Sequence, residues 1–204
     1  QTRVKKNNPQ GLLVLHGYAA TPLALWVDVL TAGEEWLTAP DYKTLTPEYF
    51  QSMLASTDQI GSVANFFPGG ILMHYIQAQK SSTTLEEMCG LSFLHGESMW
   101  NGTEAMMPGL RMVWDTLDRF GVDQAVWTPY WRNPLSGGPE GVLVSSWKRG
   151  TRLLLVLFNP AQTERQIRFD ALKNRRITDC LNNGNRVGEQ ITVPKRGFRL
   201  LLCE

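Results

Sequence analysis

The sequence predicts two fold classes in succession, an α/β segment over residues 1–135 and a small antiparallel β-sandwich over residues 136–204. In the first segment, strand-length apolar runs alternate with helix-start patterns and Gly/Pro-rich loops, as an α/β repeat requires. Residues 133–139, Asn-Pro-Leu-Ser-Gly-Gly-Pro, then form the clearest linker in the chain. Short strand-length segments separated by turn residues fill the rest, which is typical of an antiparallel sandwich or barrel.

The composition is that of a globular protein with one or two domains. Of the 204 residues, 43% are hydrophobic and 19% are charged, so the chain has enough apolar side chains to form a core. The net charge of +1 gives no general reason to expect binding to nucleic acid or to an anionic membrane. No apolar run approaches the roughly 20 residues of a membrane-spanning helix. We therefore expect neither nucleic acid nor a membrane as partner.

The sequence lacks the motifs of several classes of enzyme and metal site. Cys89, Cys180 and Cys203 are widely separated, with no CxxC pair and no metal-ligand spacing. A disulfide between Cys180 and Cys203 and a set of free buried thiols are both compatible with these positions. The chain also has no GxSxG elbow, no P-loop and no dinucleotide-binding fingerprint. We expect no metal and no cofactor.

The start of the chain and one tripeptide bear on its origin. Residues 1–10 are polar and do not begin with Met, which favours a loop or a cut end of a longer protein. Asn101-Gly102-Thr103 matches the acceptor pattern for N-glycosylation, which matters only for a secreted protein. The expected location is extracellular or in the secretory pathway.

The first expected elements lie before residue 34. Residues 12–15 are apolar and predict a short buried strand. Residues 21–22, Thr-Pro, form a helix-start pattern, and Gly33 would end that helix. A second buried strand over residues 23–30 is the alternative, because periodicity cannot decide between helix and strand over so short a run.

The next elements extend the α/β pattern. A helix is expected to begin at residue 46 and to end near Asp58. Residues 62–67 predict a strand, which the Pro-Gly-Gly of residues 68–70 stops. Residues 71–80 are mixed in character and compatible with a helix.

The last elements before the linker include the most regular helix pattern. Residues 83–86 have the spacing of a capping box and predict a short helix. A second apolar run covers residues 91–100, and residues 127–132 form an aromatic-rich segment with a proline break. A helix over about residues 108–120 is followed by Gly121. Its apolar face consists of Leu110, Val113, Trp114, Leu117 and Phe120.

Beyond the linker, breaks rich in glycine, asparagine and proline separate short segments. Each of these residue types has a turn role: glycine adopts positive φ, asparagine tolerates the left-handed region and proline ends a strand. The apolar run inside the second segment predicts a strand that is covered on both faces. The predicted strands cover residues 141–147, 151–159, 163–169, 177–181, 187–193 and 198–203.

Polar and aromatic side chains gather at or beyond the ends of two apolar runs. A buried strand that stops at such a cluster is how α/β barrels and doubly wound sheets build their sites. Ordinary surface residues beside core elements are the alternative interpretation. The candidates are His16, Tyr18, Asp28, Glu34, Glu35 and Trp36 around the first run, with His95 and Trp100 in the second.

Several blocks of sequence spread over most of the chain carry a family resemblance. The first are HGYAATP with the following DVLTAGEEW, and TPEYF with IGSVANFFPGG. LSFLHGESMW, VWTPYWRN and VLVSSWKRGTRLLLVLFNP follow them. Together they resemble the C-terminal part of a glycoside hydrolase, with a likeness to β-N-acetylgalactosaminidase-like barrel proteins. The resemblance implies that residues 1–135 are C-terminal segments of a TIM-type (β/α)8 barrel and that residues 136–204 are the β-sandwich behind it.

The resemblance also implies a missing part. A complete barrel takes about 250 residues, whereas the linker here already begins at residue 133. We therefore expect the remainder of the barrel to come from an upstream segment or from another chain. The family's acid/base carboxylates lie mostly on those earlier strands.

As a glycoside hydrolase, the protein would act on an oligo- or polysaccharide through carboxyl groups. Glycosidic cleavage usually takes two of them across the scissile bond, and substrate-assisted enzymes replace the nucleophile with the acetamido group of the sugar. Glu34 is the first catalytic candidate, because a tight turn at Gly33 can project its side chain into a cleft. Asp28 is the second, and a satisfied buried carboxylate is its alternative role.

The remaining candidates are assigned to substrate binding. Glu35, His16 and His95 can hydrogen-bond to sugar hydroxyls, although a structural role is the alternative for both histidines. Tyr18, Trp36 and Trp100 offer flat faces on which a pyranose ring can stack. A rival interpretation is a non-catalytic extracellular carbohydrate-binding or structural protein that keeps the hydrolase fold.

Overall fold

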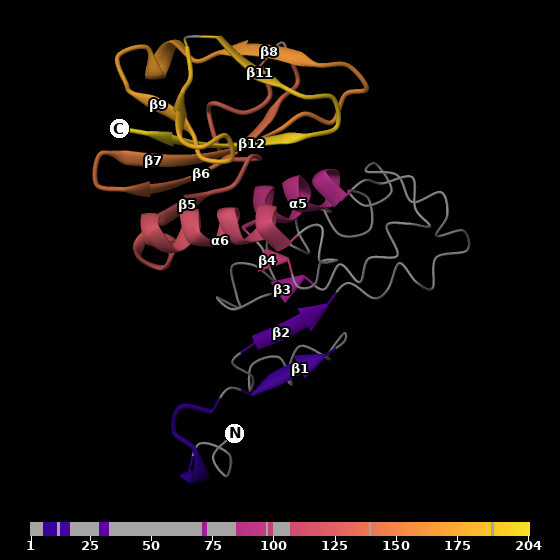
Figure 1. Cartoon of the computed structure of the whole chain (residues 1–204), viewed down its shortest axis with the longest axis vertical. Helices are drawn as coiled ribbons and strands as arrows, with labels where there is room; N and C mark the ends of the chain where they lie inside the picture. The colour runs from indigo at the N-terminus through magenta and orange to yellow at the C-terminus, as the bar shows by residue number, and fades with distance from the viewer. Residues whose placement is uncertain are drawn as a thin grey trace, which may run out of the picture. The chain divides into compact units, whose positions relative to one another are not determined.

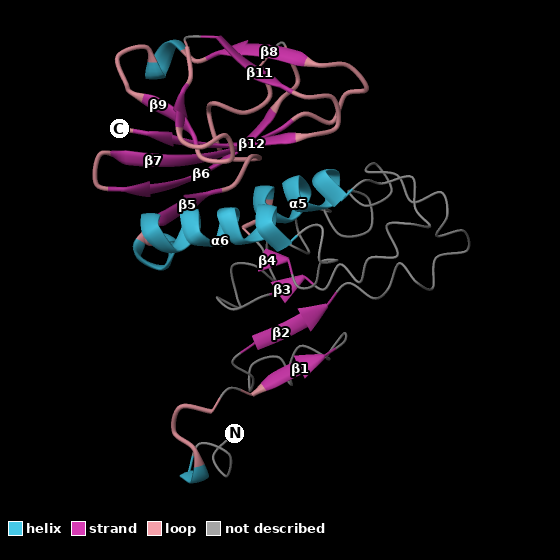
Figure 2. Cartoon of the chain, viewed as in Figure 1, coloured by secondary structure: helices cyan, strands magenta, loops and turns pink. Residues whose placement is uncertain are grey.

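A computed structural model describes the chain in two compact units (Figures 1 and 2). The first unit comprises Gln1–Thr83 and Glu97–Asn101, and the second comprises Thr84–Gly96 and Gly102–Glu204. The residues that the structure describes are 6–11, 13–16, 29–32, 71–72, 85–96, 98–99, 107–138, 140–188 and 190–204.

The described part of the first unit is a parallel sheet. Its strands are β1 (Val14–His16), β2 (Val29–Ala32), β3 (Ile71–Leu72) and β4 (Ser98–Met99), which are neighbours in this order. All three pairings are parallel. Because parallel strands need crossover connections of a dozen or more residues, this order along the chain is that of a parallel α/β arrangement.

These strands confirm one prediction and correct two. β1 confirms a strand in the first apolar run, shifted toward its end. The prediction of a helix that continues to Gly33 is wrong for its last turn, because residues 29–32 form β2. Residues 71–72 also form a strand, not a helix. Val29, Thr31 and Ile71 are β-branched and favour a strand, a preference that periodicity over two to four residues does not reveal. The predicted helix from residue 46 and strand over residues 62–67 lie outside the described residues.

The second unit begins with helix α5 (Leu85–Leu94). The helix starts where the capping-box pattern placed it, with Glu86 and Glu87 in its first turn, where they interact favourably with the helix dipole. Residues 91–94 are completely buried. They belong to the second apolar run of the sequence, which therefore ends a helix in one unit and supplies β4 to the other.

Helix α6 (Met107–Phe120) confirms the helix predicted over residues 108–120. Leu110, Val113, Leu117 and Phe120 are buried on its inner face. Gly121 follows with φ 76°, and its N–H donates to the carbonyl oxygen of Leu117 at 2.9 Å. A left-handed residue after the last turn suits glycine, which carries no Cβ to clash.

Eight strands after α6 form two antiparallel sheets in the described part of the chain. A six-stranded sheet has the order β10-β9-β12-β7-β6-β5, and a two-stranded sheet pairs β11 with β8. Their bounds are β5 (Val126–Thr128), β6 (Leu143–Arg149), β7 (Arg152–Phe158), β8 (Arg165–Arg168), β9 (Ile177–Asp179), β10 (Asn185–Arg186), β11 (Gln190–Val193) and β12 (Phe198–Cys203).

The strands match the predicted segments except at two places. Each of the six segments predicted beyond the linker overlaps one observed strand. β5 was missed because it overlaps the aromatic-rich segment of residues 127–132 before the linker, where Pro129 ends the strand after three residues. β10 was missed because it follows directly on a predicted turn. A turn is confirmed there: Asn183 and Gly184 both have positive φ in the loop that joins Asp179 of β9 to Asn185 of β10.

β7 is the centre of the second unit, and its two faces bury different layers. Leu155 and Leu157 belong to the hydrophobic core between the two sheets. Leu154 and Phe158 lie on the opposite face, on the side of α5. All five residues from Leu154 to Phe158 have no exposed surface, which confirms the prediction of a strand covered on both faces. Figure 1 shows α5 and α6 on one side of the six-stranded sheet and β8 and β11 on the other.

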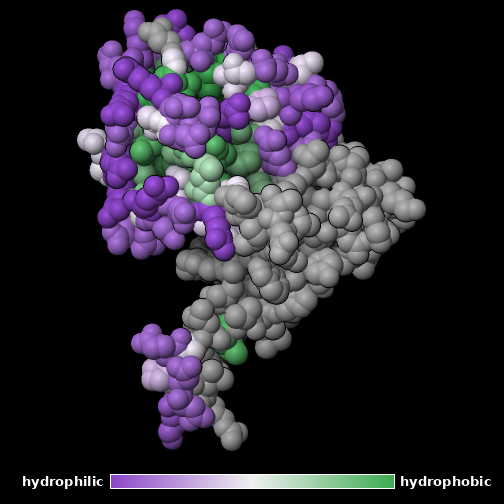
Figure 3. All heavy atoms as spheres, viewed as in Figure 1, coloured by the Kyte–Doolittle hydropathy of each residue, from purple (hydrophilic) through white to green (hydrophobic). Residues whose placement is uncertain are grey.

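The surface of the second unit is mainly polar. Figure 3 shows hydrophilic residues over most of its described surface in that view, with hydrophobic residues visible between them. Val126, on edge strand β5, is the one exposed large hydrophobic residue among those the structure describes. Within those same residues, no helix is long and apolar enough to cross a membrane.

The three cysteines are free thiols, so the alternative of a Cys180–Cys203 disulfide is wrong for this structure. Burial is the main cause that raises their pKa, to about 12 for Cys89 and Cys203 and to about 11 for Cys180. A thiol reacts as its thiolate. At neutral pH these side chains are therefore almost entirely in the protonated thiol form.

We expect Gly90→Ala to destabilise the protein, although alanine favours a helix. A Cβ at Gly90 would lie 2.8 Å from Cδ2 of Phe158 and 2.9 Å from Cβ of Phe198, too close without a shift of the packed ring. Overpacking of this kind costs about 1–3 kcal/mol. Gly109→Ala in α6 is the matched control, because no described atom outside its own helix backbone lies within 4 Å of a Cβ built at this position. The free energy of unfolding of this control should rise by up to about 1 kcal/mol, because alanine has a higher helix propensity than glycine. Urea unfolding measures both, and equal effects would contradict the close packing of α5.

Candidate functional site

The carboxyl ends of the parallel strands are the first place to look for a site. In open and barrel α/β sheets, residues at this edge of neighbouring strands come together and bind ligands. His16 is the last residue of β1. In the sequence, Glu34 follows Ala32, the last residue of β2, by two positions, and Trp100 directly follows the end of β4.

Most predicted site residues lie outside the part of the chain that the structure describes. The backbone of His16 is described but its side chain is not. The proximity of the two predicted catalytic carboxylates therefore stays a prediction. The residues outside the description are Asp28, Glu34, Glu35, Tyr18, Trp36 and Trp100.

His95 is the one predicted site residue whose side chain is described. It follows the last residue of α5 and is 1% exposed. Its Nδ1 lies 2.7 Å from the carbonyl oxygen of Leu91, one turn earlier. Because a carbonyl oxygen can only accept, Nδ1 carries the proton and Nε2 presents a lone pair. Nε2 is buried, and no described residue donates a hydrogen bond to it.

Two aromatic rings pack against His95, and a third packs against one of them. Tyr130 meets its ring edge-on at 5.4 Å between centroids, and Trp131 lies at 6.2 Å. Trp127 packs edge-on against Trp131 at 5.8 Å. Gly96 closes the group, because a Cβ there would come within 3.1 Å of the Trp127 ring. We call His95, Trp127, Tyr130 and Trp131 the aromatic cluster.

A buried serine ties the aromatic cluster to the sheet. Ser145, on β6, donates to the carbonyl oxygen of Leu94 at 2.5 Å and accepts from the backbone N–H of Tyr130 at 2.9 Å. One hydroxyl therefore joins the end of α5 to the turn that carries Tyr130 and Trp131. The turn is held a second time by Asn133, whose side chain donates to the hydroxyl of Ser146 at 3.0 Å.

The sequence identified the aromatic residues as a group but not their contact with His95. Among the tryptophans, only Trp36 and Trp100 are predicted to bind substrate, because most tryptophans of a protein lie in its core. Trp127, Tyr130 and Trp131 are each partly buried. The Nε1 atom of Trp127 is buried without a hydrogen-bond partner among the described residues. Since polar atoms of this kind are rarely left unpaired, the aromatic cluster is a candidate site in its own right.

The electrostatics of His95 favour its neutral form. Burial lowers its pKa from 6.5 to about 4, although the hydrogen bond to Leu91 acts in the opposite direction. A neutral imidazole with a free lone pair can accept a hydrogen bond from a hydroxyl. The ring lies below the surface, however, and its contact with a substrate stays a prediction.

We expect His95 to make stability depend on pH below 6.5. Its folded pKa of about 4 lies below the ordinary value of 6.5, so the unfolded chain binds the proton more tightly and stability falls as the pH drops through this window. The loss is on the order of 3 kcal/mol by pH 4. His95→Gln cannot take up the proton and should lose this part of the pH dependence. Urea unfolding at pH 7.5, 5.5 and 4.5 measures it, and parallel curves for the two proteins would contradict the assignment.

No metal centre is found among the residues that the structure describes, where no three His, Cys, Asp or Glu side chains form a group. The buried carboxylates described there are instead paired with arginines. Glu87 pairs with Arg196, and Asp179 lies 3.6 Å from Arg199. Both therefore have structural partners, unlike a catalytic carboxylate that faces a cleft.

Comparison with known proteins identifies the fold. No protein-family description and no curated protein matches the chain. An alpha-amylase from Geobacillus thermoleovorans, solved in complex with acarbose, aligns with 100% of this chain and 55% of its own, with a TM-score of 0.62 and 8% identity. An Anoxybacillus alpha-amylase aligns with 99% of this chain and 54% of its own, with a TM-score of 0.58 and 9% identity.

A noncanonic maltogenic alpha-amylase from Thermotoga neapolitana is a third match. It covers 98% of this chain and 57% of its own, with a TM-score of 0.53 and 16% identity. The chain thus spans just over half the length of these three proteins. At such low identity the likeness shows the fold alone, which is similar to that of glycoside hydrolases.

Proposed function

We propose that this chain is part of a carbohydrate-active protein, a glycoside hydrolase that cleaves O-glycosidic bonds by carboxylate acid/base catalysis. The supporting observation is the succession of a parallel sheet and an antiparallel sandwich in a fold that aligns with alpha-amylases over almost the whole chain. In this proposal the first unit supplies C-terminal segments of a (β/α)8 barrel. The rest of the barrel comes from an upstream segment or from another chain, and the protein works outside the cell or in the secretory pathway.

The strand ends rank the two proposed catalytic carboxylates. Active sites of α/β barrels lie at the carboxyl ends of the strands. In the sequence, Glu34 comes just after the last residue of β2, whereas Asp28 comes just before its first residue, Val29. The proposal therefore places Glu34 in the acid/base role and gives Asp28 the weaker claim. Whether hydrolysis proceeds with retention or with help from a substrate acetamido group is left open in the proposal.

Substrate binding is assigned to residues that stand in the sequence at or shortly after the carboxyl ends of the parallel strands. His16 ends β1, and Trp100 follows β4. Tyr18, Glu35 and Trp36 come shortly after the ends of β1 and β2. A histidine or carboxylate that hydrogen-bonds to hydroxyls, together with aromatic faces, is the set of groups that a sugar ring requires.

The pairing of the buried carboxylates favours a second candidate function. Both buried carboxylates that the structure describes are paired with arginines, so the described residues hold no buried acid that lacks an arginine partner. A protein that keeps the hydrolase fold but only binds carbohydrate, as an extracellular binding or structural module, would need no such acid.

Two measurements on the full-length protein separate these functions. Calorimetry against a panel of oligosaccharides reports binding, and release of the aryl group from aryl glycosides reports turnover. Turnover supports the hydrolase. Binding without turnover supports the non-catalytic alternative, and the absence of both would contradict a carbohydrate-active role.

A further inference from the structure

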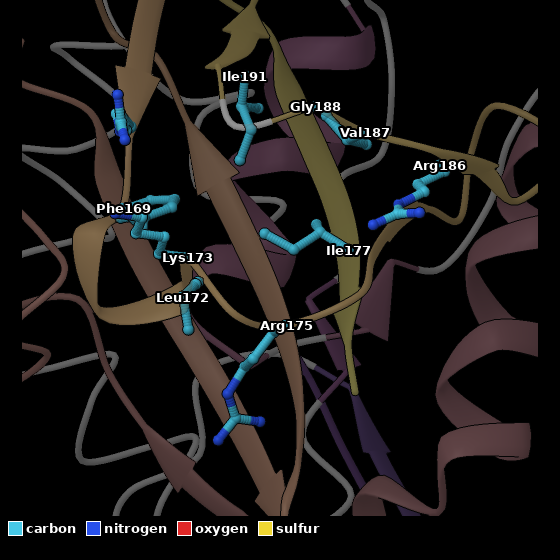
Figure 4. A pocket seen from close by; sticks show the side chains of 10 residues that line it. Phe169, Leu172, Lys173, Arg175, Ile177, Arg186, Val187, Gly188 and Ile191 are labelled. Carbon is cyan, nitrogen blue, oxygen red and sulfur yellow. The ribbon is translucent and has the colours of Figure 1, made fainter.

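Among the described residues, four positively charged side chains gather around one cavity of the β-sandwich. A pocket of about 420 Å³ opens beside η5 (Asp170–Leu172), between β8 and β11 on one side and β9 and β10 on the other. Figure 4 shows its lining. Its cationic side chains are Arg168, Lys173, Arg175 and Arg186. We call it the cationic pocket.

Nothing acidic lines this pocket within the described part of the chain. Arg168 has a nearby carboxylate, that of Asp170 at 3.4 Å, and Arg175 donates to the carbonyl oxygen of Thr151 at 2.5 Å. Lys173 and Arg186 are exposed, and no described carboxylate forms an ion pair with either. A concave surface lined by one sign of charge concentrates ligands of the opposite sign. The pocket therefore selects an anion.

The rest of the lining is apolar, which a bare inorganic anion would not use. Leu172, Ile177 and Ile191 are buried at its base, and Phe169 is half-buried beside them. The volume lies within the range of about 300–1,000 Å³ that small-molecule sites occupy. A ligand that fits both parts has a charged group for the cations and a ring with an apolar face for the base.

We propose that the cationic pocket binds an acidic saccharide unit, one that carries a carboxylate or a sulfate group. The choice of a saccharide rests on the proposed function, whereas the requirement for negative charge rests on the pocket alone. The axial C–H face of a pyranose packs on the base and on the Phe169 ring, and the anionic group is held by Lys173 and Arg186. The pocket lies entirely in the second unit, so it is a binding subsite separate from the strand ends of the first.

The test is calorimetry on the full-length protein at low salt. Its ligands are a glucuronate-containing tetrasaccharide, a sulfated tetrasaccharide of equal length, a neutral tetrasaccharide and inorganic sulfate. At least one acidic tetrasaccharide should bind at least about tenfold more tightly than the neutral one, the ratio that one charge-assisted contact supplies. Raising the salt should weaken the binding, because the cations are exposed. The two acidic ligands decide between carboxylate and sulfate.

Two double variants locate the binding. Lys173→Ala with Arg186→Ala should weaken acidic-saccharide binding at least about tenfold, because it removes two contacts to the charged group. Arg111→Ala with Lys148→Ala removes the same charge from exposed positions outside the pocket and should change affinity less than about twofold. Thermal unfolding confirms that both variants are folded.

Several results would overturn the proposal. They are equal binding of neutral and acidic tetrasaccharides, equal affinity for inorganic sulfate, and equal losses in the two double variants. Turnover of aryl glycosides in the same preparation keeps this test apart from that of the proposed function. Turnover without acidic-saccharide binding refutes only the pocket, and pocket-dependent binding without turnover supports it while refuting hydrolysis.

Discussion

Arg196→Gln is expected to lower the free energy of unfolding by about 3–5 kcal/mol, because it removes the arginine that forms an ion pair with a buried carboxylate. Nε of Arg196 donates to Oε1 of Glu87, in the first turn of α5. The Glu87 side chain is 1% exposed and that of Arg196 is 18% exposed. The pair joins α5 to the turn before β12, so its loss weakens the contact between helix and sheet. Urea unfolding of the two proteins measures the difference.

Arg168→Gln is the matched control for the charge. Arg168 pairs with Asp170 at 3.4 Å, but both side chains are more than half exposed. Exposed pairs contribute about 0–1 kcal/mol, so the control should unfold almost like the unchanged protein. The left-handed φ of 46° at Arg196 affects arginine and glutamine alike, so it does not enter the comparison. A loss below about 1 kcal/mol for Arg196→Gln would show that Glu87 does not depend on this arginine.

Glu34→Gln in the full-length protein is expected to reduce glycoside turnover at least a hundredfold, because a carboxamide can neither donate nor accept the proton of general acid/base catalysis. Glutamine has the same shape as glutamate, so the substitution tests the charge and the proton and leaves the packing unchanged. The initial rate of aryl release from an aryl glycoside measures the effect.

Glu140→Gln is the control for this substitution, because Glu140 is exposed and lies in the linker region of the second unit. Its turnover should stay within about twofold of the unchanged protein, since exposed surface changes have small effects. Equal urea midpoints for both variants exclude unfolding as the cause. An unchanged rate in Glu34→Gln would remove this residue from the catalytic assignment, and Asp28→Asn would then be the next variant.

Local patterns predicted the elements that depend on neighbours in sequence. Helix α6 followed from its apolar face and from Gly121, and the observed helix begins one residue before the predicted start. The turn at Asn183 and Gly184 followed from residue types that tolerate positive φ. The covered strand β7 was recognisable because a strand buried on both faces is a continuous apolar run. In each case the cause lies within about a dozen residues of the chain.

The sequence did not predict the elements and contacts that depend on residues far apart in the chain. The sequence showed residues 91–94 only as part of an apolar run, because a short buried strand and a buried helix have the same pattern, and these residues form a buried helix end in α5, which packs against β7. β5 is three residues long and exists because β6 pairs with it. Glu87 and Arg196 form a pair although they are 109 positions apart in the sequence, and no local pattern predicts this pair.

The candidate site divides in the same way. The sequence by itself determined that an α/β segment precedes an antiparallel sandwich, and it selected residues at strand ends, because apolar runs and turn residues are local properties of the chain. Only the tertiary structure decided that His95 is buried against Tyr130 and Trp131, and that four cations of the sandwich line one pocket. The reason is physical: burial, pKa and charge clustering depend on which distant segments fold together, and a single sequence does not state which ones do.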